Sequence, residues 1–362
     1  MLNSMYSRIK EALFPGSEAI ALPTLDGALR ANRRLDDAQL MSDTLIDCDD
    51  MIAEPNGQLL VSAGDGLFRL TAPDYSAAHQ IYKATGRIGA LATDGQNIYM
   101  AVAGQGVLCV RGGEVCAQLD RVDDTPLHCV TALTILRDGR VALTEGSAVN
   151  GLDNWSRDLL ERRSHGRLII ASPDLSDAST LAKRLAWPAG LVEKDQSLWV
   201  SESWRHRVQV YPLSGEAPST VLHNLPGYPA RIAPADNGEC WLCVSALRTQ
   251  LVEFVLRERD YCDAMLESVD PRYWIAPSLS SERHYLEPLQ GGAIKKLGIV
   301  KPWAPPRSYG LLLRLSSQGE IRESLHSRPG GEHHGITSAH PMGDQLLALS
   351  RGSGRLLRVA IP

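Results

Sequence analysis

The chain has 362 residues, of which 44% are hydrophobic and 22% are charged, and its formal net charge is −5. This apolar content is enough to bury a core and excludes a disordered chain. The negative charge argues against a nucleic-acid partner, which needs a basic face. No segment reaches the ~20 consecutive apolar residues of a membrane span, so no transmembrane helix is expected.

Residues 1–36 are expected to form an N-terminal helix and an extended arm. One helical face would carry Leu2, Met5, Tyr6, Ile9 and Leu13. Arg8, Lys10 and Glu11 interrupt the apolar pattern, which excludes a signal peptide and favours a helix that caps the main domain over a membrane anchor. The seven cysteines are odd in number and irregularly spaced, unlike a disulfide framework. A cytoplasmic location follows as an expectation.

From Ile52 onward, one three-stranded pattern occurs six times. The tight turns between the first two strands of each copy are Asn56-Gly57, Asp94-Gly95, Asp138-Gly139, Asp195-Gln196, Asn237-Gly238 and Met342-Gly343. Asx-Gly between apolar runs is a strong hairpin signal because both residues tolerate positive φ. Strand-rich repeats about 40 to 50 residues long are typical of propeller blades. The sequence therefore predicts an all-β fold, a six-bladed β-propeller over residues 37–362.

A fourth apolar run follows five of the copies and supplies the outer strand of each blade. These runs are His79–Thr85, Glu114–Asp120, Ser179–Ala186, Ser219–Leu225 and Glu320–His326. The sixth copy has none. A run of the same kind, Ala38–Ile46, stands before the first copy. We expect it to pair with the last blade and close the ring, because closure removes an exposed strand edge.

Two long insertions, 146–166 and 249–309, both fall between a second and a third strand, so both should lie over the same mouth of the tunnel. Long loops inside a compact domain are usually functional. Apolar spacing predicts a helix over about 249–268, followed by proline-rich aromatic loops. One interpretation is a lid that holds Trp274 and Trp303 against a substrate. The other, of equal weight, is a lid that packs on itself or forms a homo-oligomer with a second copy.

The tunnel lining is expected from residues just before each first strand. Counting back from the turn glycines gives Asp49, Arg87 and Thr131, with Asp50 and Arg231 one step further along. Acidic and basic side chains around one narrow axis need mutual pairing or a polar ligand. We therefore expect Arg231 to pair with Asp49 or Asp50, or to hold a carboxylate or oxyanion of the substrate.

Further titratable groups should reach the same mouth. Glu145 ends a second strand, and the adjacent His333 and His334 enter the sixth blade, which raises the odds of a catalytic role. The candidate catalytic residues are Asp49, Glu145, His333 and His334. The candidate substrate-binding residues are Asp50, Arg87, Thr131, Trp204, Arg231, Trp274 and Trp303.

Several stretches match a known family in a specific order: 22–40, 165–173, 187–208 (WPAGLVEKDQSLWVSESWRHRV), 223–232 and 308–352. In these stretches the chain resembles the strictosidine-synthase-like proteins, relatives of gluconolactonase and paraoxonase. The resemblance implies a six-bladed propeller that acts on, or binds, a small organic molecule at the tunnel mouth.

The resemblance also implies where a calcium ion would be held. Hydrolytic relatives have an acidic residue before the first blade, Asn before the third and fourth, and Asp-Asn before the fifth. Here those positions read Asp49, Thr131, Ala189 and Ala230-Arg231. Calcium takes six to eight oxygen ligands, and Arg231 would add a positive charge beside it. We expect no metal and no other cofactor.

The catalytic glutamate of the plant synthase falls here on Gly335 or Ile336, with Glu332 the nearest carboxylate. Three functions stay open. The favoured one is metal-independent hydrolysis of an ester or lactone by general acid–base groups. The second is amine–aldehyde condensation or lyase-type chemistry like that of the synthase. The third is a non-catalytic ligand-binding or scaffold propeller.

Overall fold

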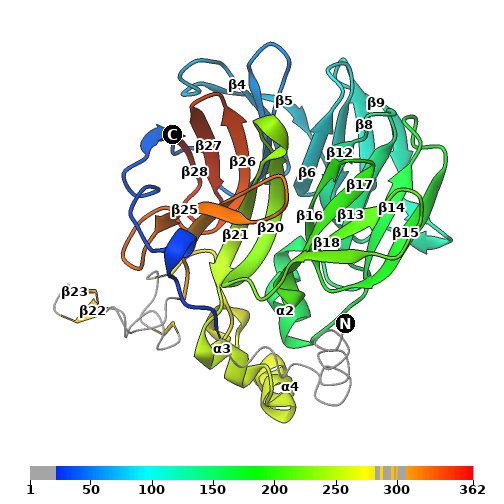
Figure 1. Ribbon diagram of the computed structural model, residues 1–362. Helices are drawn as coiled ribbons and strands as arrows, with labels where there is room; N and C mark the ends of the chain where they lie inside the picture. Colours follow the sequence, from blue (N-terminus) through cyan, green and yellow to red (C-terminus); the bar gives the residue numbers. More distant parts are fainter. Residues whose placement is uncertain (1–21, 282–285, 288–294, 297–298, 301–306, 362) are drawn as a thin grey trace.

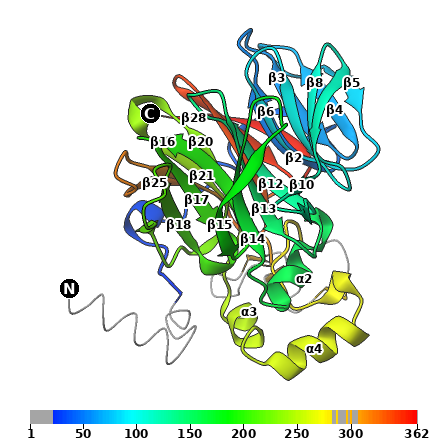
Figure 2. The same cartoon turned by 90° about the vertical axis from the view of Figure 1, so that its right-hand side faces the viewer.

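The computed structural model describes residues 22–281, 286–287, 295–296, 299–300 and 307–361. Within these ranges, six four-stranded sheets stand in a ring around a central axis (Figures 1 and 2). Neighbouring strands in every blade are antiparallel. The predicted six-bladed β-propeller is therefore confirmed.

The first three blades each use four strands in chain order. Blade 1 contains β2 (Cys48–Ala53), β3 (Leu59–Ala63), β4 (Gly66–Leu70) and β5 (Ala78–Lys83). Blade 2 contains β6 (Ile88–Thr93), β7 (Ile98–Val102), β8 (Gly106–Arg111) and β9 (Glu114–Leu119). Blade 3 contains β12 (Cys129–Ile135), β13 (Val141–Ser147), β14 (Gly166–Ala171) and β15 (Ala178–Leu185). A small hairpin, β10 (Arg121–Val122) and β11 (Thr125–Pro126), joins blades 2 and 3.

The last three blades follow the same plan. Blade 4 contains β16 (Pro188–Lys194), β17 (Ser197–Glu202), β18 (Arg207–Pro212) and β19 (Ser219–Leu222). Blade 5 contains β20 (Gly227–Pro234), β21 (Cys240–Leu247), β24 (Gly310–Leu315) and β25 (Ile321–Ser327). Blade 6 contains β26 (Ile336–Met342), β27 (Gln345–Ser350), β28 (Arg355–Ala360) and, from the other end of the chain, β1 (Gln39–Ser42).

The ring closes between the two ends of the chain, as the sequence predicts. Strand β1 pairs antiparallel with β28, with Gln39 opposite Arg358. The arm before β1 is fastened to the outer strand of blade 5. There the Asn32 side chain donates to the Ser324 carbonyl at 2.8 Å and accepts from the His326 N–H at 3.1 Å. Both the strand pairing and the arm therefore hold the final blades together.

The hairpin turns follow the backbone demands of their sequences. Gly57 and Gly95 have φ of 82° and 89°, values that a side chain would disfavour. The fourth blade lacks the glycine, and Asp195 and Gln196 adopt φ of 48° and 57° instead.

Between the blades, apolar side chains pack face to face. An example is the cluster between blades 2 and 3, which contains Ala90, Ala101, Leu143 and Ile169.

Both insertions lie on one side of the ring (Figures 1 and 2). The first carries η3 (Leu152–Asn154) and α2 (Trp155–Leu160). The second, which we call the lid over its described residues 249–281, carries α3 (Gln250–Val255), α4 (Arg259–Ser268) and η6 (Pro271–Tyr273). The single helix expected over 249–268 is thus two helices, with Thr249 capping the first by accepting from the Val252 N–H at 3.2 Å.

Other short elements complete the described chain: η2 (Gly27–Leu29), η4 (Ser203–Arg205), η5 (Asp236–Gly238), and the hairpin of β22 (Lys295–Lys296) and β23 (Ile299–Val300). The seven cysteines are free thiols. In the ranges that the structure describes, no helix combines the length and the apolar character needed to cross a membrane.

Candidate functional site

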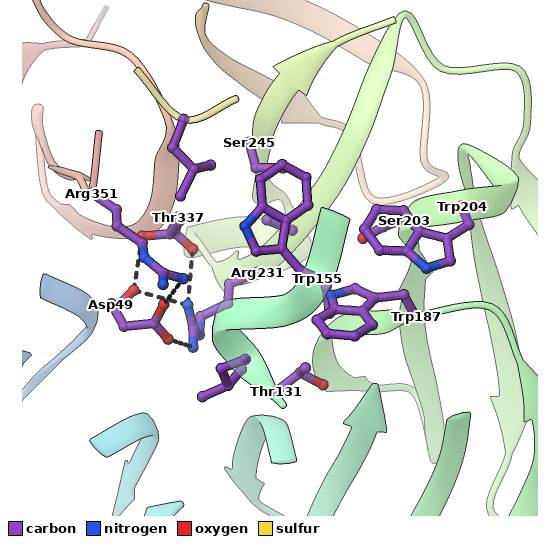
Figure 3. Close-up of a pocket in the computed structure, with 14 residues that line it drawn as sticks. Asp49, Thr131, Trp155, Trp187, Ser203, Trp204, Arg231, Ser245, Thr337 and Arg351 are labelled. Atoms are coloured by element: carbon purple, nitrogen blue, oxygen red, sulfur yellow. Dashed lines mark hydrogen bonds and ion pairs between the residues drawn. The ribbon is translucent and has the colours of Figure 1, made fainter. Parts of the chain in front are cut away.

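A pocket opens on the axis of the ring on the side that carries the two insertions. Its space is about 520 Å³, counting the part open to solvent. The lining comprises Asp49, Thr131, Leu152, Trp155, Trp187, Ala189, Ser203, Trp204, Ala230, Arg231, Ser245, Leu279, Thr337 and Arg351 (Figure 3). Five of the six blades and both insertions contribute to it. The long loops and the tunnel mouth thus meet at one place, as the sequence predicts.

One carboxylate holds two arginines at this pocket. Asp49 Oδ2 accepts from Arg231 Nη2 at 2.6 Å, and Asp49 Oδ1 accepts from Arg351 Nη1 at 2.7 Å. The Asp49 carbonyl oxygen accepts from Arg231 Nη1 at 2.9 Å and from the Thr337 hydroxyl at 2.8 Å. The Asp49 side chain is 3% exposed, whereas each of the two arginine side chains is 13% exposed. The guanidinium groups, more than the carboxylate, therefore face the pocket.

The charge state of Asp49 follows from these partners. Burial would raise the pKa of its carboxyl, but Arg231, Arg351 and Arg87 outweigh burial and lower the pKa to about 2. Asp49 is thus ionised at neutral pH and is a weak base, because an efficient general base has a pKa near the working pH. Its geometry suits orienting two arginines better than moving a proton.

Asp50 lies beneath the pocket and ties three blades together. Its carboxylate accepts from the N–H groups of Met51 at 2.8 Å and Leu91 at 2.9 Å, and from the Ser338 hydroxyl at 2.8 Å. Arg231 Nε is 3.1 Å from Asp50 Oδ2. Burial raises the pKa of Asp50 against the lowering effect of Arg231 and these hydrogen bonds. Asp50 is not part of the pocket lining, and its ion pair with Arg231 helps to hold that guanidinium in place.

Arg87 also lies beside the pocket and does not line it. Its guanidinium binds the carboxylate of Asp47, and its Nη2 donates to the Asp47 carbonyl at 3.1 Å. Arg87 Nη1 and Arg351 Nη2 lie 3.4 Å and 3.6 Å from Asp153 Oδ1, which comes from the first insertion. The arginines at the axis are thus linked to the insertion through one carboxylate.

The opposite side of the pocket is a wall of indoles. The Trp187 and Trp204 rings stack at 5.3 Å between centroids with 28° between their planes, and Trp155 stacks on Trp204 at 6.2 Å. The Trp204 ring packs edge-on against Tyr228 at 5.8 Å, and its Nε1 donates to Asp158 at 2.9 Å. Because Asp158 is only 1% exposed, this hydrogen bond anchors the wall from inside.

Thr131 lines the pocket, as the sequence predicts, with its hydroxyl turned into the backbone. The hydroxyl donates to the Pro188 carbonyl at 2.5 Å and lies 3.0 Å from the Thr144 hydroxyl. The hydroxyls of Ser203 and Ser245 likewise donate to backbone carbonyls, at 2.5 Å and 3.2 Å. Each of these three hydroxyls therefore donates its hydrogen to a backbone carbonyl, so it can only accept a hydrogen bond from a ligand.

Glu145, a candidate acid or base from the sequence, lies outside the pocket lining. Its fully buried carboxylate accepts from Arg167 Nε at 2.6 Å and from the His128 N–H at 2.7 Å. Arg167 stands directly opposite Glu145 in the β13–β14 ladder, where side chains share one face. Blade 4 repeats the arrangement with Glu202 and Arg207. These glutamates stabilise the blade ends.

The two histidines are also placed outside the pocket lining. His334 Nδ1 lies 2.8 Å from the Ser308 hydroxyl and its Nε2 lies 3.0 Å from the Arg328 carbonyl, so the ring is held at both ends. His333 is buried, its Nδ1 has no hydrogen-bond partner, and burial together with Arg355 lowers its pKa. Neither ring faces the space between the arginines and the indoles.

Of the two lid tryptophans, Trp274 lies within the described residues. Trp274 is 3% exposed and packs inside the lid with Val255 and Met265, and its Nε1 donates to the Val269 carbonyl at 2.9 Å. Trp274 thus belongs to the apolar interior of the lid and does not line the pocket. Trp303 lies outside the described residues. The lid reaches the pocket instead through Leu279.

The residues at the axis do not fit a calcium ion. Asp49 is already bound by Arg231 and Arg351, the Thr131 hydroxyl donates to a backbone carbonyl, and Ala189 and Ala230 offer no side-chain oxygen. Over the described ranges, no three His, Cys, Asp or Glu side chains gather in a way that could hold a metal ion.

Several residues of the pocket escaped the sequence reasoning, among them Arg351, Trp187 and Trp155. Arg351 follows the second strand of blade 6, and Trp187 directly precedes the first strand of blade 4. Both positions recur in every repeat, so aligning the repeats could have found them. Trp155 comes from an insertion that has no counterpart in the other repeats, and the sequence carries no comparable signal for it.

No protein-family model matches the chain. Among curated proteins, Strictosidine synthase-like 13 of Arabidopsis thaliana is 27% identical over 240 residues, which are 65% of this chain and 53% of that protein. Strictosidine synthase-like 4 of the same plant is 25% identical over 64% of this chain and 66% of that protein. The human adipocyte plasma membrane-associated protein is 24% identical over 76% of this chain and 63% of that protein. The matches thus span about half to two thirds of these relatives.

Among solved structures, a gluconolactonase from Xanthomonas campestris covers 91% of this chain and 92% of its own, with a TM-score of 0.58 and 14% identity. At that identity the likeness shows the fold alone. The chain thus shares the six-bladed β-propeller fold of that structure. Its sequence is similar to the strictosidine-synthase-like proteins, which confirms the resemblance seen in the sequence.

Proposed function

We propose that the chain is a small-molecule enzyme that works at the tunnel mouth without calcium, and that it hydrolyses an ester or lactone. The observation that carries the proposal is the Arg231–Asp49–Arg351 group, in which two guanidiniums are fixed on one buried carboxylate and face the pocket. In the hydrolytic relatives that the sequence resembles, a metal would supply positive charge at this axis. Here the arginines supply it.

In this proposal, the arginines stabilise the negative charge that develops on the substrate. Water adds to the ester carbonyl carbon, and the carbonyl oxygen becomes an oxyanion that accepts hydrogen bonds from Arg231 and Arg351. The bond from the carbonyl carbon to the leaving oxygen then breaks, and that oxygen takes up a proton that the water released. Fixed donors aimed at such an oxyanion typically contribute about 3 to 4 kcal/mol to catalysis.

A second candidate is a ligand-binding propeller without catalysis, and one observation favours it. Asp49 is the sole carboxylate among the described residues that line the pocket, and its pKa of about 2 makes it a weak base. The same observation weighs against synthase-like condensation. Glu332, the carboxylate nearest to the synthase position, is 72% exposed and bound to Arg355, outside the pocket lining.

The experiment that separates these candidates is a hydrolysis assay with a panel of aryl esters and lactones in excess chelator. The proposal expects turnover in the wild type that survives the chelator and falls about 100-fold or more in Arg351→Gln, the size expected for loss of one oxyanion donor. Arg355→Gln, which removes an arginine paired to an exposed carboxylate outside the pocket, is the matched control and should keep full activity. Absence of turnover across the panel would favour the binding propeller.

A further inference from the structure

The pocket has two chemically different sides. The Asp49–Arg231–Arg351 group lies on one side, and the indoles of Trp155, Trp187 and Trp204 lie on the other (Figure 3). We propose that the pocket takes a flat aromatic compound, with its ring against the indoles and its carboxylate or ester carbonyl bound by the two arginines. This rests on the proposed function, because it names the substrate class of the same site.

The polar side selects a hydrogen-bond acceptor. The Asp49 side chain is 3% exposed, and each of its oxygens already accepts from an arginine. Arg351 Nη2 is 3.6 Å from Asp153, which is too long for a hydrogen bond and leaves that nitrogen able to donate to a ligand. A guanidinium with free N–H donors matches the two oxygens of a carboxylate. Within the pocket lining, a ligand ammonium would instead meet two cations and one carboxylate that is 3% exposed.

The apolar side selects a flat ring. Trp204 stacks on both Trp155 and Trp187, with 28° between the planes in each pair, and all three indoles line the pocket. Trp204 is fixed by the hydrogen bond to Asp158 and by its edge contact with Tyr228. A wall that is already rigid loses little conformational entropy when a ligand binds. Aromatic pairs in offset or edge-on arrangements gain energy beyond their buried area, so an aromatic ring is preferred over an aliphatic ring of similar size.

The rest of the lining supports a compact ligand. Leu152 from the first insertion and Leu279 from the lid add apolar surface beside the indoles. The space of about 520 Å³ includes a part that is open to solvent. The site therefore suits one or two fused rings with a single acidic or ester substituent.

The test is calorimetric titration of the full chain with four probes. They are 1-naphthylacetate, 1-naphthylacetamide with the same ring and no charge, 2-(1-naphthyl)ethylamine with the same ring and a positive charge, and cyclohexylacetate with the same charge and no aromatic ring. We expect naphthylacetate to bind about 10-fold or more tightly than each of the others, because a charge-assisted hydrogen bond and ring stacking are each worth about that factor. The proposal is overturned if the amine or cyclohexylacetate binds as tightly, or if none of the four binds at millimolar concentration.

Single substitutions show which part of the ligand each side of the pocket binds. Arg351→Gln should weaken naphthylacetate about 10-fold and naphthylacetamide by clearly less, because the neutral amide carbonyl loses a hydrogen bond without charge assistance. Trp155→Leu should weaken naphthylacetate and leave cyclohexylacetate nearly unchanged. Because Trp155→Leu keeps the ion pairs at the axis, it tests the proposal even if Arg351→Gln unfolds. Arg355→Gln should bind all four probes like the wild type. If Trp155→Leu weakens both acids equally, the ring preference is wrong.

Binding and turnover can fail separately. Naphthylacetate has no ester bond, so its affinity does not depend on catalysis. Tight naphthylacetate binding without hydrolysis of any ester would overturn the proposed hydrolase and leave the ligand class intact. Hydrolysis of aliphatic lactones by a chain that does not bind naphthylacetate would overturn the ligand class alone.

Discussion

Arg231 of blade 5 and Asp49 of blade 1 form an ion pair at the axis of the ring, with Arg231 Nη2 2.6 Å from Asp49 Oδ2, although 182 residues separate them in the chain. The pair joins blades 1 and 5, which stand on either side of blade 6 in the ring. A second arginine, Arg351 of blade 6, holds the other carboxylate oxygen. Stability and ligand binding should therefore both depend on this one group.

Replacing Arg231 by alanine should destabilise the fold by about 3 kcal/mol, the lower end for breaking a buried ion pair, because Arg351 still partners Asp49. The double variant Arg231→Ala with Asp49→Ala should recover part of this loss, since the stranded carboxylate is then gone. Urea unfolding of the wild type, both single variants and the double variant measures the coupling. Equal stability of Arg231→Ala and the wild type would show that the pair adds nothing to the fold.

The pKa of Asp49 predicts a loss of stability in acid. Its carboxyl has a pKa of about 2 in the folded chain against an ordinary value of 3.8, so its contribution is complete above about pH 4 and is lost as the pH falls toward 2. The difference corresponds to about 2 kcal/mol. Asp50, whose pKa is raised, works in the opposite direction and favours the folded state at lower pH.

Unfolding free energies of the wild type and Asp49→Asn between pH 5 and 2 isolate this contribution. The gap between the two proteins should shrink as the pH falls below 4. A gap that stays constant down to pH 2 would mean that Asp49 is not held ionised by its arginines.

The lid contacts two glycines of blade 6 through Leu279, and a substitution at one glycine can disturb this contact selectively. A Cβ on Gly352 would lie 1.9 Å from the Leu279 carbonyl oxygen, and one on Gly335 would lie 2.8 Å from it. Gly352→Ala should displace Leu279 from the pocket. We expect weaker binding of naphthylacetate and faster proteolysis within the lid, with the blades still folded by circular dichroism.

Gly151→Ala is the matched control for this substitution, because nothing lies within 4 Å of the Cβ it would add. It should bind and resist proteolysis like the wild type. If Gly352→Ala behaves in the same way, the contact between Leu279 and blade 6 does not position the lid.

Removal of residues 1–43 should abolish folding. The truncation deletes β1, which pairs with β28, and the arm that binds Ser324 and His326 of blade 5. An unpaired β28 would expose a strand edge that favours aggregation. Removal of residues 1–21 leaves every one of these contacts and should be tolerated. Size-exclusion chromatography and thermal melts distinguish the two products, and a folded monomer of the longer truncation would contradict the closure.

The blades and the axis pair could be predicted because both depend on local, repeated signals. Turns such as Asp94-Gly95 mark each hairpin, and counting back from them places Asp49 and Arg231 at the same level of the ring. Side-chain direction at a strand end is different. Glu145 ends a second strand near the mouth, yet its carboxylate binds Arg167, because the register of β13 against β14 places these two residues opposite each other.

The aromatic half of the pocket could be predicted only in part: Trp204 was a candidate from the sequence and Trp187 occupies a position that recurs in the repeats, but Trp155 does not. Trp155 begins α2 inside an insertion, so no repeat position places it on the axis. Trp274 appeared in a promising aromatic loop, but the fold of the lid uses it as core. Insertions pack according to their own tertiary contacts, and composition alone does not say which of their tryptophans faces a ligand.

The claim that arginines take the place of a metal at the axis is tested most directly by calcium titration of chelator-treated protein. Calorimetry and thermal melts would be followed together over micromolar to millimolar calcium. The arrangement of Arg231 and Arg351 on Asp49 predicts no saturable heat and no rise in the melting temperature. Binding of one calcium ion per chain with a clear rise in melting temperature would contradict it.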